Sequence, residues 1–558
     1  MSERLTTNQI SGRSAFISLL RDEGVTTLFG NPGTTELPIM DALSEQSDIG
    51  YVMGMQEAIV VAMADGYARA SGRLAVCNVH VAPGLGNAMG SLFTAMQAGS
   101  PLLITAGQQE QGHGLTEPLL YAPLVPIAEP MVKWAVEVNR IEDLPRVMRR
   151  AAKVALTEPT GPVFISLPGD ILNTEAPLDL GAATRVDTTS RPTAAAVDAL
   201  ANRLLSARAP VIVAGHEVVA SDAFEAVGDF ATALGAPAYK QTVDSGAHFP
   251  SEHPAYIGTL PRNQARVREV MSAHDVMICV GSDVLRMSVH SEVDPLPETT
   301  AVIQIGQRDW ELGKNYPAEI AIRADVRETL VDLVAALRRI GGEQHSERAA
   351  AAIAALAEDN WSARRARRYA TAMNNAKVSP MAPDWLMAAM VDNLPDNSIV
   401  VDEGITSASA LLDLLPFRHR YSYIGNISGG IGWGVPAAVG VALARPEARV
   451  TAIIGDGSAM YNIQALWSAA KHKLPITYVI ANNGGYRIIK QRLKSFHDND
   501  NFIGMDFADP PVNPSKLAEG LGMRAIRAET PDAFVAAMQE ATKSDGPVLI
   551  DALVQGHV

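Results

Sequence analysis

Two polar residues follow neighbouring apolar segments in the last quarter of this 558-residue sequence. Asp456 stands in a Gly-Asp-Gly-Ser motif directly after the β-branched run 450–454. Asn483 stands in an Asn-Asn-Gly-Gly motif after the run 476–481, 27 positions downstream (483 − 456). Carboxylate and carboxamide oxygens are the hard ligands that Mg²⁺ prefers, and bare glycine amides suit phosphate oxygens. The sequence therefore predicts a magnesium-bound diphosphate held by Asp456 and Asn483.

Backbone groups beside these two residues complete the predicted site. The Gly485 carbonyl can supply a third metal ligand after its tight turn, with phosphate oxygens and water filling the octahedron. The amides of Gly457 and Ser458 open the next predicted helix and so point at the diphosphate. Either motif alone is more often a plain turn, whereas the pair, each at a strand end, favours the site.

Two further residues stand out in the first third of the chain. Glu57 precedes the run Ala58–Ala64 of small and apolar residues, where a buried carboxylate needs a partner. His80 follows the predicted strand 74–79 and precedes a glycine-rich turn, so a neutral imidazole there can move protons. An exposed glutamate at a helix start and a packed or solvent-facing histidine are the plainer alternatives.

Short β-branched runs alternate with alanine-rich stretches along the chain, which predicts an α/β fold of three doubly wound parallel-sheet domains. A Thr/Pro-rich linker (184–193) and a charged, alanine-rich segment (343–368) separate the domains, predicted at 1–185, 190–342 and 370–558. The strands are predicted at 26–29, 74–79, 101–106, 162–167, 210–214, 276–280, 301–305, 398–402, 450–454, 476–481 and 548–553.

The first and third domains share a closing signature. Gly161-Pro-Val-Phe-Ile165 ends one, and Gly546-Pro-Val-Leu-Ile550 ends the other, each after an alanine-rich helical pattern. A duplicated α/β unit explains the match better than a chance likeness of two Gly-Pro turns.

Composition narrows the class of protein. A formal net charge of −15 argues against nucleic acid and anionic membranes as partners, although a local positive site for an anionic substrate stays open. The two cysteines, Cys77 and Cys279, lie in apolar runs and are expected to be buried, reduced thiols. The polar start, residues 1–9, predicts no signal peptide, and the apolar run 429–444 is broken by glycines and Pro436, so we expect a cytoplasmic enzyme.

Several segments together resemble the decarboxylase and carboligase family of thiamine-diphosphate enzymes, and within it the benzoylformate decarboxylases. The resemblance covers nearly the whole chain. Its segments are Phe29-Gly-Asn-Pro-Gly-Thr-Thr-Glu-Leu-Pro38, Gln56-Glu57, Ala64-Asp-Gly-Tyr67, Gly84-Leu-Gly-Asn-Ala-Met-Gly90, Gly107-Gln-Gln109 and Gly455-Asp-Gly-Ser458. It implies a first domain that binds the pyrimidine of thiamine diphosphate, a structural central domain and a third domain that binds the diphosphate with Mg²⁺.

The resemblance also implies roles for single residues around the cofactor. Glu57 would protonate a pyrimidine nitrogen, the Gly429 carbonyl would accept from the aminopyrimidine, and Ile431 would wedge under the bent cofactor. Thr406 and Tyr486 would contact the cofactor as well. Because the family places this glutamate and the diphosphate site on different subunits, it implies a dimer or a dimer of dimers.

For the substrate, the resemblance implies that His80 assists proton transfer and that Thr34 replaces a serine that contacts the carboxylate. The second family histidine is less clear, since a gap-free alignment places Ser288 there and only a small loop shift would place His290.

Three further positions depart from benzoylformate decarboxylase. Ile405 replaces a threonine, which weakens any side-chain role there. Ile488 replaces an alanine and narrows the room for an aromatic ring, and Arg492 replaces a phenylalanine. Arg492 can bind an anionic substrate group or simply be a surface charge.

The leading hypothesis is a 2-oxo acid decarboxylase with a possible carboligase side activity. The alternative is a lyase or synthase of the same family, such as an acetolactate synthase or a 2-hydroxyacyl-CoA lyase. The chain stops soon after its last strand, which counts modestly against a CoA substrate. A non-catalytic paralogue would most simply lack Glu57, Asp456 or Asn483, and all three are present.

Overall fold

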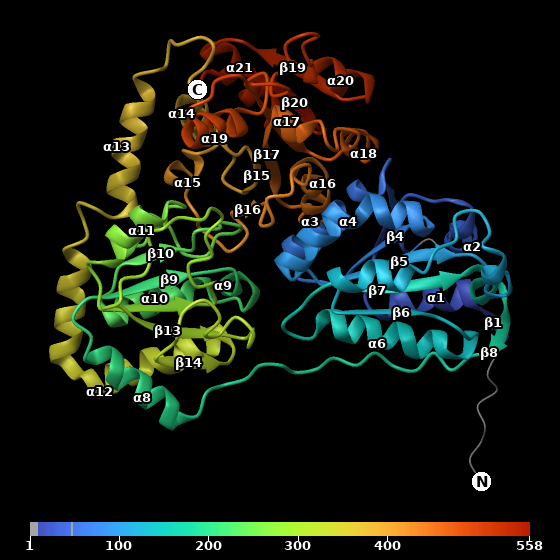
Figure 1. Ribbon diagram of the computed structural model, residues 1–558, viewed down its shortest axis with the longest axis horizontal. Helices are drawn as coiled ribbons and strands as arrows, with labels where there is room; N and C mark the ends of the chain where they lie inside the picture. The colour runs from blue at the N-terminus through green and yellow to red at the C-terminus, as the bar shows by residue number, and fades with distance from the viewer. Residues whose placement is uncertain (1–8, 46–47) are drawn as a thin grey trace.

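The computed structural model describes residues 9–45 and 48–558 and contains three domains, each built on a six-stranded, all-parallel sheet (Figure 1). The predicted fold class is thus confirmed. The three sheets show which strands belong to the same domain. The exact domain boundaries stay predictions. Within the described residues no helix is long and apolar enough to cross a membrane. Residues 1–8, which carry most of the polar start, lie outside the described part.

In the first domain the strands lie in the spatial order β3-β2-β4-β5-β7-β6, with a small antiparallel pair, β1 and β8, at the side. Their bounds are β1 Gln9–Ser11, β2 Thr27–Gly30, β3 Gly50–Met53, β4 Ala75–Val79, β5 Leu102–Gln108, β6 Trp134–Glu137, β7 Val163–Pro168 and β8 Glu175–Pro177. The helices are α1 Gly12–Asp22, α2 Leu37–Glu45, α3 Glu57–Ser71, α4 Val81–Ala98, α5 Leu124–Ala128, α6 Leu144–Leu156 and α7 Gly169–Asn173.

The central domain has the order β11-β10-β9-β12-β13-β14. Its strands are β9 Pro210–Ala214, β10 Ala238–Lys240, β11 Tyr256–Thr259, β12 Val276–Val280, β13 Ala301–Gly306 and β14 Ile320–Arg323. Its helices are α8 Ala194–Leu205, α9 Glu217–Ala220, α10 Phe224–Leu234, α11 Gln264–Met271 and α12 Val326–Ala354, and α13 Trp361–Met373 leads on to the third domain. Residues 178–193, which include the predicted linker, contain neither helix nor strand.

The third domain has the order β16-β15-β17-β18-β20-β19. Its strands are β15 Ser398–Glu403, β16 Tyr423–Gly425, β17 Arg449–Gly455, β18 Ile476–Asn482, β19 Arg524–Ala528 and β20 Val548–Leu553. Its helices are α14 Pro383–Asp392, α15 Leu411–Leu414, α16 Gly434–Ala444, α17 Asp456–Ala459, α18 Ala465–Lys471, α19 Arg487–His497, α20 Pro514–Gly520 and α21 Pro531–Ala541.

The first and third sheets share one topology. Numbered from the first strand of each sheet, both follow the order 2-1-3-4-6-5, whereas the central sheet follows 3-2-1-4-5-6. The two Gly-Pro signatures lead into β7 and β20, which occupy the same place in their sheets. The topology therefore supports the hypothesis of a duplicated unit.

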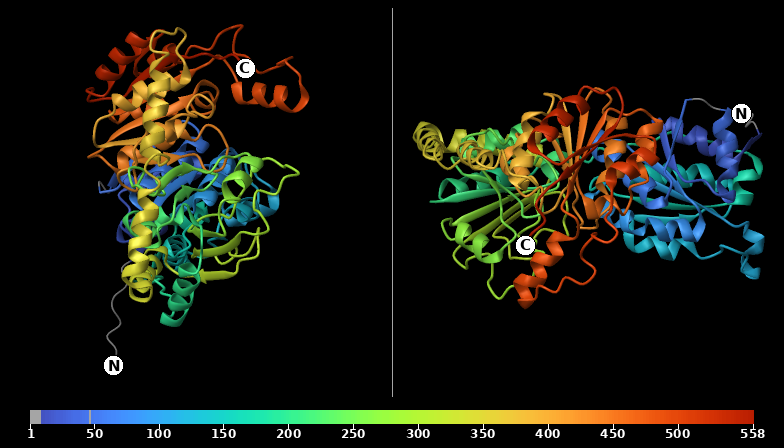
Figure 2. Two further views of the ribbon diagram at one scale, coloured as in Figure 1. Left: turned by 90° about the vertical axis from the view of Figure 1, so that its left-hand side faces the viewer. Right: turned by 90° about the horizontal axis from the view of Figure 1, so that it is seen from above.

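One hydrophobic core joins the first and third domains. It contains residues of β4 and β5, of helices α3 and α4, and of α16, α18 and the third sheet. Gly66 of α3 faces the carbonyl of Ala437, and Gly440 of α16 faces the carbonyl of Met63, so a Cβ atom at either glycine would overlap backbone. The helices therefore cross at backbone contact, and Figure 1 shows them side by side. Seen from above, the third domain lies over the junction of the other two (Figure 2).

Both cysteines are free and buried, as expected. Burial raises the pKa of Cys77, in β4, and that of Cys279, in β12, the latter to about 12. Neither thiol is therefore ionised near neutral pH.

Candidate active site

Asp456 lies at the carboxyl end of β17, where its side chain is 3% exposed. Its Oδ2 atom accepts hydrogen bonds from the backbone N–H groups of Gly484 and Gly485, at 2.8 and 3.0 Å. Its Oδ1 atom accepts from the N–H of Gly457 at 3.0 Å. Burial raises the pKa of Asp456 to about 6, although these N–H donors oppose the shift. The two motifs of the sequence therefore meet through one carboxylate.

Asn483 follows β18, which pairs with β17 in parallel, so both polar residues lie at the same edge of the sheet. Its Nδ2 atom donates to the hydroxyl of Ser407 at 3.2 Å. The Gly485 carbonyl accepts from the N–H of Arg487 at 3.0 Å, and carbonyl oxygens can still bind a cation through a second lone pair. The Asn483 amide oxygen, by contrast, has no hydrogen-bond donor among the residues that the structure describes.

Tyr486 covers the glycine of the first motif. Its ring lies where a Cβ atom of Gly457 would stand, and it contacts Phe507 edge-on at 4.9 Å between ring centroids. Position 457 thus needs glycine for close packing. Ser458 is buried in α17, a helix of only four residues, and the Gly457 amide is already bonded to Asp456.

The donor set of this edge suits a hard cation bound to phosphate. One buried carboxylate, one carboxamide and one backbone carbonyl are few ligands, which leaves room for phosphate oxygens and water around Mg²⁺. In the described ranges 9–45 and 48–558, no group of three or more His, Cys, Asp or Glu side chains could hold a metal by themselves. The residues therefore fit a shared metal–diphosphate site better than an all-protein metal cage.

The loop after β15 holds two more of the predicted residues. Thr406 is half-buried, and Ile405 is 44% exposed with a φ of +48°. A β-branched residue rarely adopts that left-handed conformation, which costs on the order of 1–3 kcal/mol. The backbone is therefore strained at the position where the sequence departs from the resembling enzymes.

The segment after β16 contains Gly429 and Ile431. Gly429 has a φ of +77° and is exposed, and Ile431 is half-buried. The N–H of Gly429 donates to the Asn426 side chain at 3.2 Å. The segment thus projects a glycine and a branched side chain from the same sheet edge as Asp456.

Glu57 lies at the first position of α3 in the first domain and is 7% exposed, so it is not a solvated helix-start residue. Its Oε2 atom accepts from the side-chain amide of Asn87 at 3.0 Å, and its carboxyl packs against the backbone of Gly84. Among the described residues of one chain, no hydrogen bond or ion pair joins Glu57 to Asp456 or Asn483.

His80 is held by a residue to which the sequence assigned no role. Its Nδ1 atom lies 2.7 Å from Oε2 of Glu36, which is fully buried. Glu36 also accepts from the N–H groups of Gly33 and Gly107, both at 2.9 Å. Because the Glu36 carboxylate is held as a hydrogen-bond acceptor, Nδ1 of His80 must carry the proton that it donates. Nε2 of a neutral His80 is then free to accept a proton. The sequence signals for Glu36 were its place in the resembling segment 29–38 and an acid that follows a buried strand.

Thr34 is exposed in the short 3₁₀ turn Thr34–Glu36. It lines a cavity of about 690 Å³ together with Thr35, Gln108, Gln109 and His113. Thr35 also contacts His80, with its hydroxyl 3.2 Å from Nδ1. The substrate residues predicted in the first domain therefore lie near one concave surface.

The remaining predicted residues are less enclosed. Ser288 and His290 are both exposed in the loop after β12, so their burial does not select between them. Ile488 is half-buried in α19, and Arg492 is exposed, with its guanidinium 5.5 Å from the ring centroid of Phe496.

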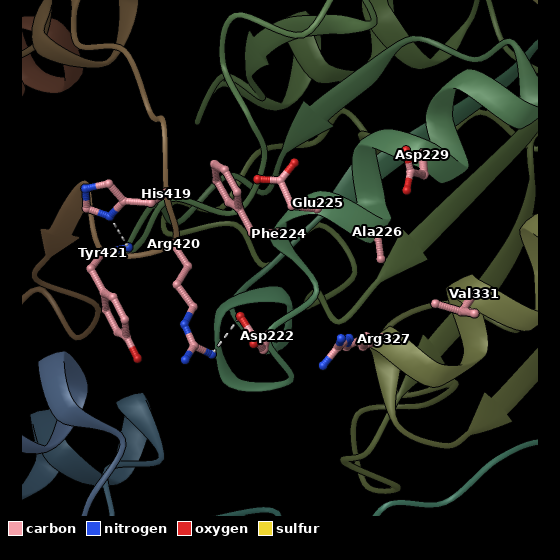
Figure 3. A pocket seen from close by; sticks show the side chains of 10 residues that line it. All are labelled: Asp222, Phe224, Glu225, Ala226, Asp229, Arg327, Val331, His419, Arg420 and Tyr421. Carbon is pink, nitrogen blue, oxygen red and sulfur yellow. Dashed lines mark hydrogen bonds and ion pairs between the residues drawn. The ribbon is translucent and has the colours of Figure 1, made fainter.

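A second cavity, of about 520 Å³, lies between the central and third domains (Figure 3). Arg420 and Asp222 form an ion pair across it at 3.1 Å. None of the predicted site residues lines this cavity.

Comparison with known proteins identifies the class that this fold and site define. Family models for the thiamine pyrophosphate (thiamine diphosphate) enzymes match in three parts: the N-terminal TPP-binding domain at residues 10–118, the central domain at 197–333 and the C-terminal TPP-binding domain at 404–552. The chain therefore belongs to the thiamine pyrophosphate enzyme family and is a thiamine-diphosphate-dependent enzyme.

The relatives narrow that class. The chain is 33% identical to benzoylformate decarboxylase from Pseudomonas aeruginosa, over 97% of this chain and 98% of that protein. It is 28% identical to the acetolactate synthase isozyme 3 large subunit of Escherichia coli, over 98% and 95%. Among solved structures it resembles the 4-hydroxybenzoylformate decarboxylase of Rhodococcus jostii RHA1, with a TM-score of 0.86, 30% identity and coverage of 98% and 100%. The benzoylformate decarboxylase of Polynucleobacter necessarius gives a TM-score of 0.86 at 28% identity, with coverage of 98% and 99%.

Proposed function

We propose that this enzyme is a Mg²⁺-dependent decarboxylase of a 2-oxo acid, with carboligation as a side activity. The relatives named benzoylformate decarboxylase match 97% and 98% of this chain, which supports the reaction class. The observation that carries the metal and diphosphate assignment is the Asp456 carboxylate, which joins the two motifs at one sheet edge. Asp456, Asn483 and the Gly485 carbonyl hold Mg²⁺, while Thr406, Ser458, Gly457 and Tyr486 surround the diphosphate.

Thiamine diphosphate, when bound, supplies the nucleophilic carbon and the electron sink that decarboxylation of a 2-oxo acid requires. The Gly429 carbonyl would accept a hydrogen bond from the aminopyrimidine, and Ile431 would pack against the cofactor. Glu57 holds a proton at the pyrimidine nitrogen, in surroundings that exclude water. Nε2 of His80 takes up or returns a proton beside the substrate, because Glu36 fixes its ring. The Thr34 hydroxyl binds the substrate carboxylate.

The site is complete only in a dimer or a dimer of dimers. Glu57 belongs to the first domain and the proposed metal ligands to the third, and the described residues of one chain show no hydrogen bond or ion pair between them. We propose that Glu57 of one chain faces the Asp456 edge of its partner. Each dimer then contains two sites that are related by its symmetry.

The substrate pocket differs from that of an enzyme for aromatic 2-oxo acids. Ile488 narrows the space beside the reacting carbon, and Arg492 offers a guanidinium to an anionic group in a paired chain. His290 acts as a second proton carrier if its loop turns inward, and otherwise Ser288 takes its place. The second candidate function is a lyase or synthase of the same family, favoured by the full-length match to acetolactate synthase.

The test uses purified protein stripped of metal and then supplied with thiamine diphosphate and Mg²⁺. A panel of benzoylformate, aliphatic 2-oxo acids, 2-oxo diacids and a 2-hydroxyacyl thioester is followed for carbon dioxide and aldehyde. We expect one of each per 2-oxo acid consumed, only when both additions are present. If 2-hydroxy ketones form as the main product, or if only the thioester is cleaved, the decarboxylase assignment is wrong.

A further inference from the structure

Glu403, the last residue of β15, is a buried carboxylate that the proposed chemistry does not use. It is 3% exposed. Its Oε2 atom accepts from the N–H of Gly434 at 2.8 Å, and Oε1 accepts from the N–H of Trp433 at 3.2 Å. Gly434 is the first residue of α16, so the carboxylate satisfies N–H groups at the start of that helix and opposes its positive end.

Asn426 connects this carboxylate to the glycine segment. Its Nδ2 atom donates to Oε1 of Glu403 at 2.7 Å and to the carbonyl of Gly430 at 2.6 Å. Its Oδ1 atom accepts from the N–H groups of Ser428 and Gly429, at 3.0 and 3.2 Å. Residues 426–434, here called the cradle segment, are therefore tied at both ends to one carboxylate.

The shape of the cradle segment needs such support. Gly429 and Gly432 have φ values of +77° and +98°, conformations that glycine adopts at an entropic cost. The Gly432 carbonyl accepts from the Asn462 side chain at 2.7 Å, and a Cβ atom at Gly434 would press on Glu403 itself. Without the Glu403 contacts, the buried N–H groups of Trp433 and Gly434 would lose their acceptor. The Asn426 amide would keep only its bond to Gly430.

The charge of Glu403 changes near neutral pH. Burial raises its pKa to about 7, opposed by the donors from Gly434, Asn426, Trp433 and Gly432. The elements packed against it carry Asp402 on β15, Tyr423 on β16 and Asp456 after β17, and none of these is among the causes of its shift. The carboxyl of Glu403 is therefore protonated when the pH is below about 7. A protonated carboxyl oxygen donates a hydrogen bond, so it no longer accepts one from the N–H group that it faces.

We propose that Glu403 is a positioning residue: acting through Asn426, it holds the cradle segment in the shape that receives the aminopyrimidine, and it does so in its ionised form. The inference rests on the proposed function, because that function places Gly429 and Ile431 against the pyrimidine. Glu403 itself does not touch the cofactor. Affinity for thiamine diphosphate should therefore weaken as the pH falls through 7, in addition to any titration of the cofactor.

The experiment compares wild-type protein with Glu403→Gln at pH 8 and pH 6, in saturating Mg²⁺. Calorimetry gives the Kd for thiamine diphosphate. At pH 8 the variant should bind about tenfold more weakly, the loss expected for one charged hydrogen bond. At pH 6 the ratio should approach one, because the wild-type carboxyl is then protonated as well. Glu217→Gln is the matched control, since Glu217 is also buried and accepts a backbone N–H, from Gln307 at 2.7 Å in the central domain.

Two further measurements separate positioning from general damage. Hydrogen exchange at the amides of Trp433 and Gly434, in cofactor-free protein at pH 8, should speed up in Glu403→Gln and in Asn426→Ala, but not in Glu217→Gln. If wild-type protein binds no thiamine diphosphate, the proposed function fails and the exchange rates alone decide this inference. Unchanged exchange, or a Kd ratio equal at both pH values, would overturn it.

Discussion

The first and third domains share one strand order, but the loops at the carboxyl edges of their sheets carry different groups. The strands β4 and β17 occupy equivalent places, and they lead into His80 and Asp456. The strands β3 and β16 lead into Glu57 and the cradle segment. One edge thus carries an acid and an imidazole suited to proton transfer, and the other carries glycine amides and the carboxylate that we propose as a metal ligand. The same strand order thus carries both sets of groups, and the sequences of the loops determine which set each sheet presents.

The equivalent strands β2 and β15 each lead to a buried glutamate that accepts hydrogen bonds from backbone N–H groups. Glu36 follows β2 in the first domain, and Glu403 is the last residue of β15 in the third. Glu36 orients His80, and Glu403 supports the cradle segment. In both copies a buried acid therefore holds a neighbouring loop, although the loop it holds has a different function.

The substitution Glu57→Gln gives the largest expected effect and tests whether the two sheet edges have different roles. If the carboxyl edge of the first domain's sheet supplies proton transfer alone, affinity for the cofactor should stay within a few-fold of wild type. Exchange of the cofactor C2 proton should slow by about 10²–10⁴-fold, the usual contribution of a positioned acid or base. Proton exchange is measured by nuclear magnetic resonance after quenching in acid. Glu129→Gln, on an exposed turn, is the control and should change neither.

The corresponding change at the carboxyl edge of the third domain's sheet is Asp456→Asn. In the variant, the side-chain NH₂ group must face either the N–H donors of Gly484 and Gly485 or the N–H donor of Gly457, so at least one backbone donor loses its acceptor. We expect Mg²⁺-dependent affinity for thiamine diphosphate to fall by about 100-fold, measured by calorimetry. Asp532→Asn, in the first turn of α21, is the control. Tight Mg²⁺-dependent binding by the Asp456 variant would remove Asp456 from the metal site.

A third substitution tests the close packing of α3 against α16, which joins the first and third domains. In Gly440→Ala the added methyl group overlaps the Met63 carbonyl, so α3 and α16 must separate. The free energy of unfolding should fall by roughly 1–3 kcal/mol, the usual cost of overpacking. Gly520→Ala, at a helical glycine with open space around it, should change it by less than about 1 kcal/mol. Chemical denaturation measures both, and equal values would mean that the helix crossing tolerates a side chain.

The smallest expected effect concerns the substrate. Arg492→Phe should shift the ratio of kcat/KM values from 2-oxo diacids toward benzoylformate by about tenfold, if the guanidinium binds an anionic group. Lys494→Phe, on the same helix and also exposed, serves as the control. An unaltered preference in the Arg492 variant would place this arginine on the outer surface of the assembled enzyme.

The strands that the sequence predicts lie inside their sheets, and those it misses lie mainly at the edges. In the first and third sheets the four inner strands were predicted, and the edge strands β3, β6, β16 and β19 were not. Inner strands of parallel sheets are covered on both faces and form continuous apolar runs. The edge strand β6 is half-buried throughout, and β19 has two exposed, two half-buried and one buried residue, so neither forms a continuous buried apolar run.

The candidate site divides in a similar way. The meeting of the Asp456 and Asn483 motifs at one sheet edge could be predicted because each motif stands at the end of an apolar strand. Glu36 and Glu403 were not given roles because their partners come from other elements: Gly107 and His80 for one, Trp433 and Gly434 for the other. Only the folded topology brings those groups together. Which of Ser288 and His290 faces the site stays a prediction, because both are exposed in the described structure.

Mixing two inactive variants tests most directly whether edges from two chains form one site. The purified Glu57→Gln and Asp456→Asn variants are each unfolded partially, mixed and allowed to reassociate, and decarboxylation of the best 2-oxo acid is measured with thiamine diphosphate and Mg²⁺. If the halves come from different chains, the mixed dimer contains one intact site, and random pairing should restore about a quarter of wild-type activity. If reassociated mixtures, shown by mass spectrometry to contain mixed dimers, gain no activity over the separate variants, the two edges do not combine in this way.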